Sequence, residues 1–451
     1  MWSATPAPNI GGSQGDVLSA VSCTAVAVCA AVGSTAQGTL SNRWNGSTWT
    51  AQPTPVPYAS PQYSQLTSVS CVSDTACVTV GQYADQLFNR LPFADAWDGS
   101  AWMSMPMPGP MGTPGSQLAG VSCPSATMCV AVGSNGDFQS FSELWNGSKC
   151  KGSLLSAWTP PGSTQASLSS VSCPTTRACV AVGSYIASGQ LHALTEQWNG
   201  SAWTAMGNAQ ADSGTLVSVA CTTSTSCMAV GSTNASTPGA FAESWDGTGW
   251  QSVPTPAGAG SQKLLAVACP AAGTCEAVGY GTNGGSSPQA PIVDGWDGAT
   301  WSQQLTPSFR TASRLSGVSC GSTTLCTAVG YQSNGAATLA EQWNGSAWAL
   351  QLTPNSTGAT SNSLDAVACP TTTTCVAIGR SQGGSPGMAT TLAERWDGTS
   401  WVAQPIPTQG LLLSVSCPTT SFCSAAGAGG KSLGDSSGNG TNLTLVESYV
   451  A

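Results

Sequence analysis

The chain has 451 residues, of which only 7% are charged, and it carries a net charge of −9. In ordinary globular proteins about a quarter of the residues are charged. Its eleven basic residues are scattered, which excludes nucleic-acid binding, since that requires clustered Lys and Arg. No apolar run is long enough for a membrane-spanning helix. We expect no signal peptide either, because repeat-like sequence follows Met1 directly.

One pattern recurs along the whole chain. Its clearest copy runs from the apolar segment 364–369 through Cys375–Gly379 to the segment Glu394–Trp401. The first cysteines of successive copies lie 48, 52, 50, 48, 48, 51, 49 and 48 residues apart. A period of about 40–50 residues is typical of propellers and solenoids.

Each copy is expected to form four short antiparallel strands. In the copy around residue 180, these are Leu168–Cys173, Cys179–Gly183, Ala193–Trp198 and a strand that begins at Trp203. Asn199-Gly200 joins the last two strands, and Asn-Gly or Asp-Gly stands there in all eight complete copies. This dipeptide predicts a two-residue type I′ hairpin turn, in which both residues have positive φ. The second strand is apolar or small at consecutive positions, which indicates a sheet with both faces buried.

These features predict an all-β, nine-bladed β-propeller with four antiparallel strands per blade. The ninth copy ends after its third strand, and the missing strand matches the N-terminal segment that begins at Trp2. We therefore expect residues 1–8 to pair with the blade of residues 410–451 and close the ring. The whole chain, 1–451, would be one domain of nine repeats of roughly 49 residues. Eight blades and a detached unit form the alternative.

Eighteen of the nineteen cysteines form nine pairs with C-x5-C spacing. A zinc site would need four grouped ligands, whereas these pairs lie far apart and the chain has a single histidine, His192. We therefore expect no cofactor or metal, and nine disulfides formed in an oxidising, extracellular setting. The predicted bonds are Cys23–Cys29, Cys71–Cys77, Cys123–Cys129, Cys173–Cys179, Cys221–Cys227, Cys269–Cys275, Cys320–Cys326, Cys369–Cys375 and Cys417–Cys423.

The Cys pairs and the W-[ND]-G-x-x-W motif together resemble those of secreted bacterial, actinobacterial-type β-propeller repeat proteins. The resemblance covers essentially the whole chain and implies the fold, but no function that can be transferred. The turn Asp397–Trp401 is also similar to the Asp-box of sialidase-like propellers, although its spacing is one residue shorter.

An acidic residue recurs two positions before the first Trp of the repeat. It is either part of a ring of cation-binding carboxylates or a structural hydrogen-bonding group repeated in every blade. Its near-regular occurrence favours the structural interpretation. The residues are Asp95, Glu143, Glu196, Glu243, Asp294, Glu341, Glu394 and Glu447, with Asn42 in the first repeat.

Irregular loops are a better guide to function than the repeat itself. The second repeat gathers aromatic residues in the loops of one predicted face, and aromatic rings are good platforms for sugars or protein partners. They could equally pack beneath a long loop. The candidate ligand-binding residues are Tyr58, Tyr63, Tyr83, Phe88 and Phe93.

The third repeat differs at its turn. After Trp145-Asn146-Gly147, eight residues, 148–155, are interpreted as an insertion before Trp158. Cys150 lies there and is predicted to be a free thiol, with an intermolecular disulfide as the alternative.

Enzymatic signals are weak. His192 has no nucleophile motif beside it. Asp85 and Asp137 are off-pattern acids that could form a glycosidase pair, and Arg310 and Arg314 are the only close arginines.

The sequence therefore favours a secreted, monomeric, non-catalytic module that binds glycan ahead of an extracellular protein. A structural or protein-interaction scaffold is the second hypothesis, and a glycoside hydrolase or lyase is the third.

Overall fold

The structure is a computed structural model. It describes residues 2–4, 16–35, 38–55, 63–105, 115–136, 139–147, 150–151, 162–205, 214–258, 260–282, 288–306, 311–356, 358–383, 389–404, 406, 410–430 and 442–450.

The described strands form nine four-stranded antiparallel sheets, one for each repeat, which we number as blades. Blades 1 to 3 are β2 (Val17–Ala25), β3 (Val28–Thr35), β4 (Gly38–Trp44), β5 (Trp49–Gln52); β6 (Tyr63–Ser73), β7 (Ala76–Ala84), β8 (Arg90–Trp97), β9 (Trp102–Met105); and β10 (Gln117–Ser125), β11 (Met128–Ser134), β12 (Ser140–Trp145), β13 (Cys150–Lys151). Blades 4 to 6 are β14 (Ser163–Thr175), β15 (Ala178–Ala187), β16 (Gln190–Trp198), β17 (Trp203–Ala205); β18 (Gly214–Thr223), β19 (Ser226–Thr233), β20 (Ala240–Trp245), β21 (Trp250–Ser252); and β22 (Gln262–Ala271), β23 (Thr274–Gly281), β24 (Ala290–Trp296), β25 (Trp301–Gln303). Blades 7 to 9 are β26 (Arg314–Ser322), β27 (Leu325–Gln332), β28 (Ala337–Trp343), β29 (Trp348–Gln351); β30 (Ala359–Thr371), β31 (Thr374–Gly383), β32 (Ala389–Trp396), β33 (Trp401–Ala403); and β34 (Gly410–Thr419), β35 (Phe422–Gly430), β36 (Asn442–Val450), β1 (Trp2–Ala4).

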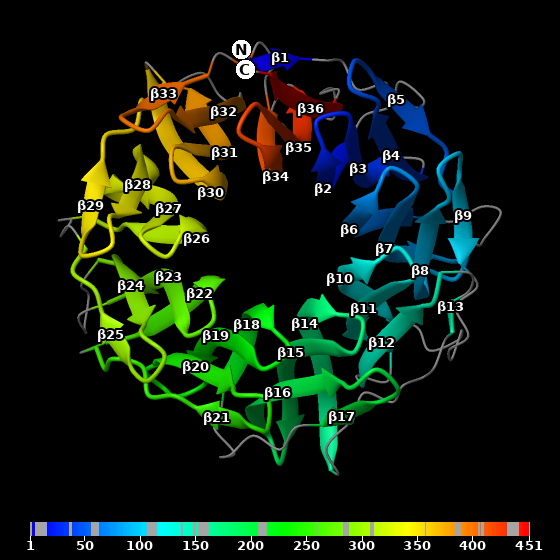
Figure 1. Cartoon of the computed structure of the whole chain (residues 1–451), viewed down its shortest axis with the longest axis horizontal. Helices are drawn as coiled ribbons and strands as arrows, with labels where there is room; N and C mark the ends of the chain where they lie inside the picture. Colours follow the sequence, from blue (N-terminus) through cyan, green and yellow to red (C-terminus); the bar gives the residue numbers. More distant parts are fainter. Residues whose placement is uncertain are drawn as a thin grey trace.

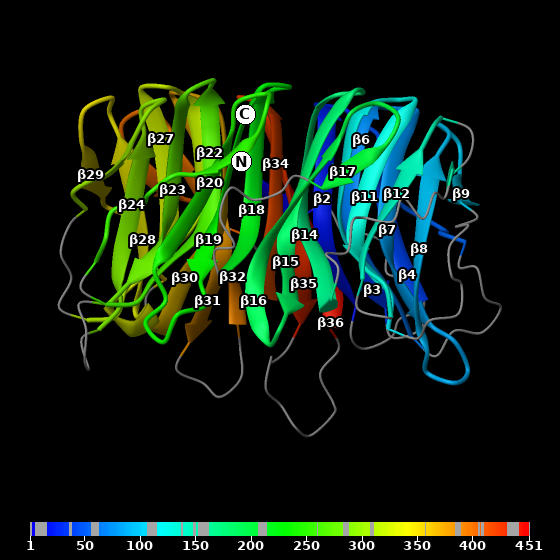
Figure 2. The ribbon, with the colours of Figure 1, turned by 90° about the horizontal axis from the view of Figure 1, so that it is seen from below.

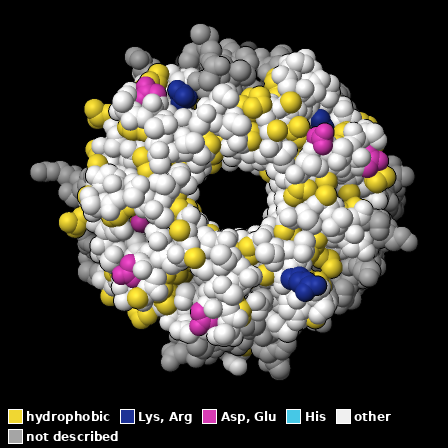
Figure 3. Space-filling view, viewed as in Figure 1, with side chains coloured by type: hydrophobic (Ala, Val, Ile, Leu, Met, Phe, Trp, Pro, Cys, Tyr) yellow, Lys and Arg dark blue, Asp and Glu magenta, His cyan; other side chains and the backbone are white. Residues whose placement is uncertain are grey.

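The nine blades stand around a central channel in a ring (Figure 1), and the side view shows a disc (Figure 2). The channel is open in the space-filling view (Figure 3). The predicted closure is confirmed, because β1 pairs with β36 in the register Trp2↔Tyr449, Ser3↔Ser448 and Ala4↔Glu447. Among the described residues, the single helix is the 3-10 turn η1 (Ser333–Gly335), and no helix is long and apolar enough to cross a membrane.

Hydrophobic side chains fill the spaces between neighbouring blades. In blade 4, for example, Val180 and Val182 pack with Leu216, Phe241 and Trp245 of blade 5. The second strand of a blade is buried at consecutive positions because it has a neighbouring blade on each face, as the sequence predicts. The invariant glycine of this strand has no room for a side chain. A Cβ on Gly183 would lie 1.9 Å from the carbonyl oxygen of Ser167, beside the bulge in β14.

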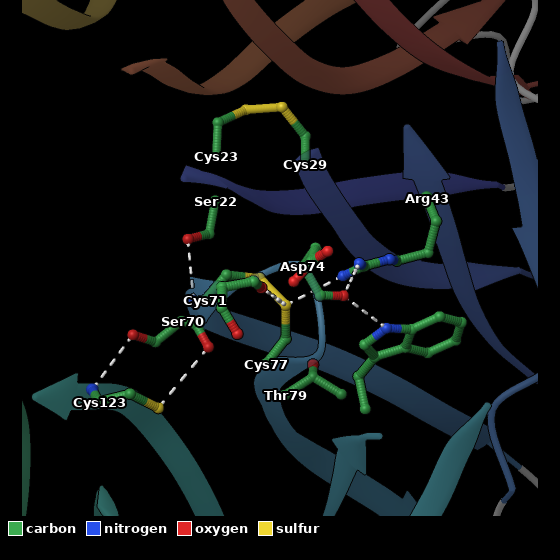
Figure 4. Close-up of a disulfide and its surroundings, with 12 residues drawn as sticks. Ser22, Cys23, Cys29, Arg43, Ser70, Cys71, Asp74, Cys77, Thr79 and Cys123 are labelled. Atoms are coloured by element: carbon green, nitrogen blue, oxygen red, sulfur yellow. Dashed lines mark hydrogen bonds between the residues drawn. A yellow bond between two sulfur atoms is a disulfide. The ribbon is translucent and has the colours of Figure 1, made fainter. Parts of the chain in front are cut away.

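The nine predicted disulfides are all present, and each staples the hairpin between the first two strands of its blade. The serine before the first cysteine links the blades (Figure 4): the backbone N–H of Cys71 donates to Ser22 Oγ at 3.1 Å, and that of Cys123 donates to Ser70 Oγ at 3.1 Å. Cys23 N–H repeats the contact across the ring closure, to Ser416 Oγ at 3.1 Å. These contacts satisfy N–H groups of the innermost strands, which have no further strand beside them.

The turn between the last two strands differs from the prediction. In seven blades the two tryptophans of the turn, such as Trp198 and Trp203, pair directly and enclose four residues. Only the glycine of the turn has positive φ, 96° at Gly200, so the predicted type I′ turn is wrong. Asn199 Oδ1 instead accepts hydrogen bonds from the backbone N–H groups of Ser201 (2.9 Å) and Ala202 (3.0 Å). Because Asp offers the same acceptor oxygen, Asp and Asn are interchangeable at this position.

Blade 3 corrects a second expectation. Cys150 pairs with Trp145 in the ladder, at the position that the second tryptophan occupies in other blades. The extra residues of this repeat therefore follow the fourth strand, β13, and do not precede it. Trp158 and most of the insertion lie outside the described residues. Whether Cys150 carries a free thiol stays a prediction.

Candidate functional site

The recurrent acidic residues whose side chains the structure describes are buried between blades. Glu196, Glu341, Glu394 and Asp95 are fully buried, and burial raises the pKa of each of the three glutamates to about 8 and that of Asp95 well above its usual range. A carboxyl with such a pKa is mostly neutral at pH 7, so it attracts cations only weakly.

The hydrogen-bonding interpretation of these acids holds only in part. Glu196 Oε1 accepts a hydrogen bond from Ser140 of the preceding blade at 3.0 Å, whereas neither carboxyl oxygen of Glu341 has a hydrogen-bond partner among the described residues. No group of three or more His, Cys, Asp or Glu side chains that could hold a metal ion occurs in the described part of the chain. The side chain of Glu447 lies outside the description.

Two of the five aromatic candidates belong to the core. Tyr83 is 4% exposed and Phe93 is fully buried, and their rings meet edge to face with centroids 6.0 Å apart. Both pack against Ala30 and Val32 of blade 1. For Tyr83 and Phe93, the alternative that the rings pack in the core is therefore correct. Every second residue of β7 and β8 faces blade 1, and these two residues are among them. Neither ring can meet a ligand.

Two other candidates are exposed on the face of the ring opposite the disulfide hairpins. Tyr63 is 43% exposed at the start of β6, and Phe88 is 74% exposed in the loop between β7 and β8. Tyr58 lies outside the described residues.

Polar side chains surround Tyr63. Tyr63 of β6 pairs with Ala84 of β7, and Ala84 pairs on its other side with Arg90 of β8. Two residues further along β6, Gln65 pairs with Gln82. Paired residues point to the same face of a sheet, so the end of blade 2 presents a tyrosine, an arginine and two amides together on one face. The Tyr63 hydroxyl donates to Gln65 Oε1. Burial raises the pKa of Tyr63, while Arg90 and Gln82 oppose the shift.

A loop with several internal hydrogen bonds presents Phe88 beside this face. Asp85 Oδ1 accepts hydrogen bonds from the N–H groups of Leu87 (2.8 Å) and Asn89 (2.9 Å), and the Asp85 carbonyl accepts one from Phe88 N–H at 3.0 Å. Phe88 has a φ of 61°, which is rare for a bulky residue and strains the backbone. Leu87 is 80% exposed, so the loop ends in an apolar Leu-Phe tip.

The residues considered for catalysis have other contacts. Asp85 accepts the hydrogen bonds of its own loop, and Asp137 lies outside the described residues. His192 stacks on Tyr185 with ring centroids 5.0 Å apart. Arg314 lies over the Tyr331 ring at 5.2 Å, and Arg310 is outside the description.

A pocket that the sequence analysis did not identify lies between blades 2 and 3 on the face of the disulfide hairpins. Its volume is about 270 Å³, and its lining includes Ala96, Trp97, Met103, Cys129 and Trp145. Figure 3 looks onto this face, where acidic and basic side chains are scattered and form no large cluster. The signal for the pocket is visible in the sequence once the repeats are aligned, because Ala96 stands where the first repeat has Arg43.

No protein-family model and no curated protein matches this sequence. Several solved structures resemble its fold. Sqt1 of Chaetomium thermophilum, bound to the N-terminus of the ribosomal protein L10, has a TM-score of 0.51 and 10% identity, covering 85% of this chain and 96% of that chain. YCF48 bound to D1 peptide has a TM-score of 0.44 and 13% identity, covering 87% and 97%. The SapL1 lectin in complex with alpha methyl fucoside has a TM-score of 0.35 and 14% identity, covering 64% and 94%. At these identities the likeness concerns the fold alone.

Proposed function

We propose that this chain is a secreted, non-catalytic recognition module that binds glycan at the end of blade 2 that lies on the face of the ring opposite the disulfide hairpins. The observation that carries the proposal is the grouping of an exposed Tyr63 with Gln65, Gln82 and Arg90 on one face of the sheet. The nine disulfides favour an oxidising, extracellular location.

The proposed site suits a sugar in two respects. A tyrosine ring offers an apolar face for the C–H groups of a pyranose, and it loses little conformational entropy on binding. The amide N–H₂ groups of the two glutamines and the guanidinium of Arg90 supply hydrogen-bond donors for hydroxyl groups. The strands hold these side chains on a rigid scaffold, which lowers the entropic cost of binding.

Binding to a broad glycan panel tests this proposal, with Tyr63→Ala and Tyr63→Phe as paired variants. We expect Tyr63→Ala to weaken glycan binding at least tenfold, about 1.4 kcal/mol, and Tyr63→Phe, which keeps the ring, to lose less. Because Tyr63 is exposed, thermal unfolding should stay unchanged in both variants. A panel without any binding by the unmodified protein would contradict the glycan proposal.

The second candidate function is recognition of a protein partner by the Leu87-Phe88 tip. It is favoured by two adjacent apolar side chains that protrude, at 80% and 74% exposure, from a loop fixed by Asp85. Such anchors fill pockets on a partner and dominate interface energetics. Phe88→Ala separates the two functions: it should abolish capture of a protein partner from an extracellular extract and leave Tyr63-dependent glycan binding intact.

A further inference from the structure

We propose that the pocket between blades 2 and 3 binds the arginine side chain of a polypeptide partner. This site lies on the face of the disulfide hairpins, so it is independent of the proposed glycan site at the other end of blade 2. The argument comes from the equivalent position one blade earlier, where the protein fills the same space with an arginine of its own.

That arginine is Arg43, the residue before the first tryptophan of blade 1. Its guanidinium crosses to blade 2 and lies over the Trp97 ring, 4.5 Å from the centroid. Nη2 donates to the Asp74 carbonyl at 2.8 Å, and Nη1 lies 3.0 Å from Cys77 Sγ of the disulfide. Figure 4 shows these groups around the disulfide. An indole face, a hairpin carbonyl and a disulfide sulfur thus form a guanidinium site in this fold.

Blade 3 supplies the same three groups to the next site. Trp145 is the first tryptophan of its repeat, as Trp97 is in blade 2, and Cys129 is the second cysteine of the disulfide, as Cys77 is. Ala126 follows the first cysteine by three residues, as Asp74 does, so its carbonyl is the equivalent acceptor. All three residues line the pocket.

Among the described residues, no side chain takes the place of the Arg43 guanidinium in this space. The residue equivalent to Arg43 is Ala96, which also lines the pocket and is too small to reach blade 3. Two other blades fill the position: Leu144 packs into the core with blade 4, and at Gly295 the Gln304 side chain occupies the space of the absent Cβ. Trp145 is moreover paired in the ladder with Cys150, where other blades have a second tryptophan, and it remains partly exposed.

Size and charge agree with an arginine side chain. A volume of about 270 Å³ lies below the range of about 300–1,000 Å³ that is typical of sites for whole small molecules, and it suits one long side chain. Asp98 at the pocket is exposed, and hydrogen bonds from Ala101 and Ser100 lower the pKa of its carboxyl, so it is an anion at neutral pH. Met103 is 47% exposed and offers an apolar wall for the methylene stem.

Calorimetric titration of the oxidised protein tests the proposal, with an arginine pentapeptide, Gly-Gly-Arg-Gly-Gly, as the probe. The matched ligand has citrulline in place of arginine, which keeps the shape and removes the charge. We expect one peptide bound per chain, with an affinity at least tenfold higher for arginine than for citrulline. Equal binding of both peptides would overturn the proposal, and tighter binding of free L-arginine than of the peptide would overturn the assignment to a polypeptide.

Two substitutions fill the pocket from within. Ala96→Arg places a guanidinium on Trp145 as Arg43 does on Trp97, and Ala96→Leu copies Leu144 of the next blade. Either variant should weaken binding of the arginine peptide at least tenfold. Ala349→Arg adds the same charge at an exposed position of blade 7 and controls for electrostatic repulsion. If either pocket-filling variant folds and still binds as the unmodified protein does, the site is not this pocket.

Discussion

At the scale of single residues, the most unusual feature is the set of buried carboxyls between blades. A buried carboxylate without a cation or several donors would cost several kcal/mol, so the group takes up a proton instead. This explains how the fold tolerates Glu or Asp at the same inner position in most repeats. The carboxyl is a neutral, shape-filling group, and its protonation links the stability of the ring to pH.

Glu341 gives a direct test of this link. Burial raises its pKa from the usual 4.5 to about 8. Because the folded state holds the proton between these two values and the unfolded state does not, the free energy of unfolding falls as the pH rises from about 4.5 to about 8. The slope is about 1.4 kcal/mol per pH unit for one such group. Glu341→Gln removes this titration. The thermal midpoint of the variant should therefore rise steadily, relative to the midpoint of the unmodified protein, between pH 5 and pH 8.

Asp397→Asn is the control for this experiment. Asp397 lies in an exposed turn, where hydrogen bonds from Thr399 and Ser400 lower its pKa to about 2. Its carboxyl stays ionised in the folded and the unfolded chain from pH 5 to pH 8. The difference in thermal midpoint between this variant and the unmodified protein should therefore stay constant over that range. A parallel profile for Glu341→Gln would mean that Glu341 does not titrate with folding.

At the scale of secondary-structure elements, the turn between the last two strands depends on one side-chain oxygen. Asn344 Oδ1 accepts hydrogen bonds from Ser346 N–H (2.9 Å), Ser346 Oγ–H (2.8 Å) and Ala347 N–H (3.0 Å). Asp397 makes the equivalent contacts in blade 8, at 2.9, 2.7 and 2.9 Å. The side chain performs the task that a capping residue performs at a helix N-terminus.

We therefore expect Asn344→Ala to lower the free energy of unfolding by about 1 kcal/mol, as the loss of a cap does. Asn344→Asp should be close to neutral, because it restores the acceptor that blade 8 uses. Urea-induced unfolding of the two variants measures the difference. Equal losses in both would show that the amide N–H₂ group, and not the oxygen, stabilises the turn.

At the scale of the whole molecule, three sets of contacts close the ring between blades 9 and 1. The ladder between β1 and β36 supplies backbone hydrogen bonds, and Phe422 of blade 9 stacks on Trp44 of blade 1 with centroids 6.0 Å apart. Ser416 continues the serine contacts across the junction. The ends of the chain are thus held in one sheet, as in Figure 1, where the two termini lie side by side.

Removal of residues 1–8 should weaken this closure. Without β1, strand β36 keeps an unpaired edge, and unpaired edges promote association between chains. We expect a lower thermal midpoint and a concentration-dependent increase in mass by size-exclusion chromatography with light scattering. A synthetic peptide of residues 1–8 should reverse both effects. An unchanged midpoint and mass would show that the core contacts suffice for closure.

The amino-acid sequence determined the architecture of this protein by itself. The period of the repeats, the nine cysteine pairs and the N-terminal match to the missing strand predict nine blades, their disulfides and the closing strand. The sequence predicts the blades and their disulfides because each depends on residues that lie close together in one repeat. It predicts the closing strand because the last repeat lacks its fourth strand.

Only the tertiary structure decided which side chains are available for binding. Tyr83 and Phe93 face the neighbouring blade and are buried, whereas Tyr63 and Arg90, on the other face of the same sheet, reach the surface. The turn type and the pocket beside Ala96 likewise depend on backbone angles, bulges and the blade opposite. The physical reason is that a propeller buries both faces of every sheet, so the alternation of a single strand does not separate inside from outside.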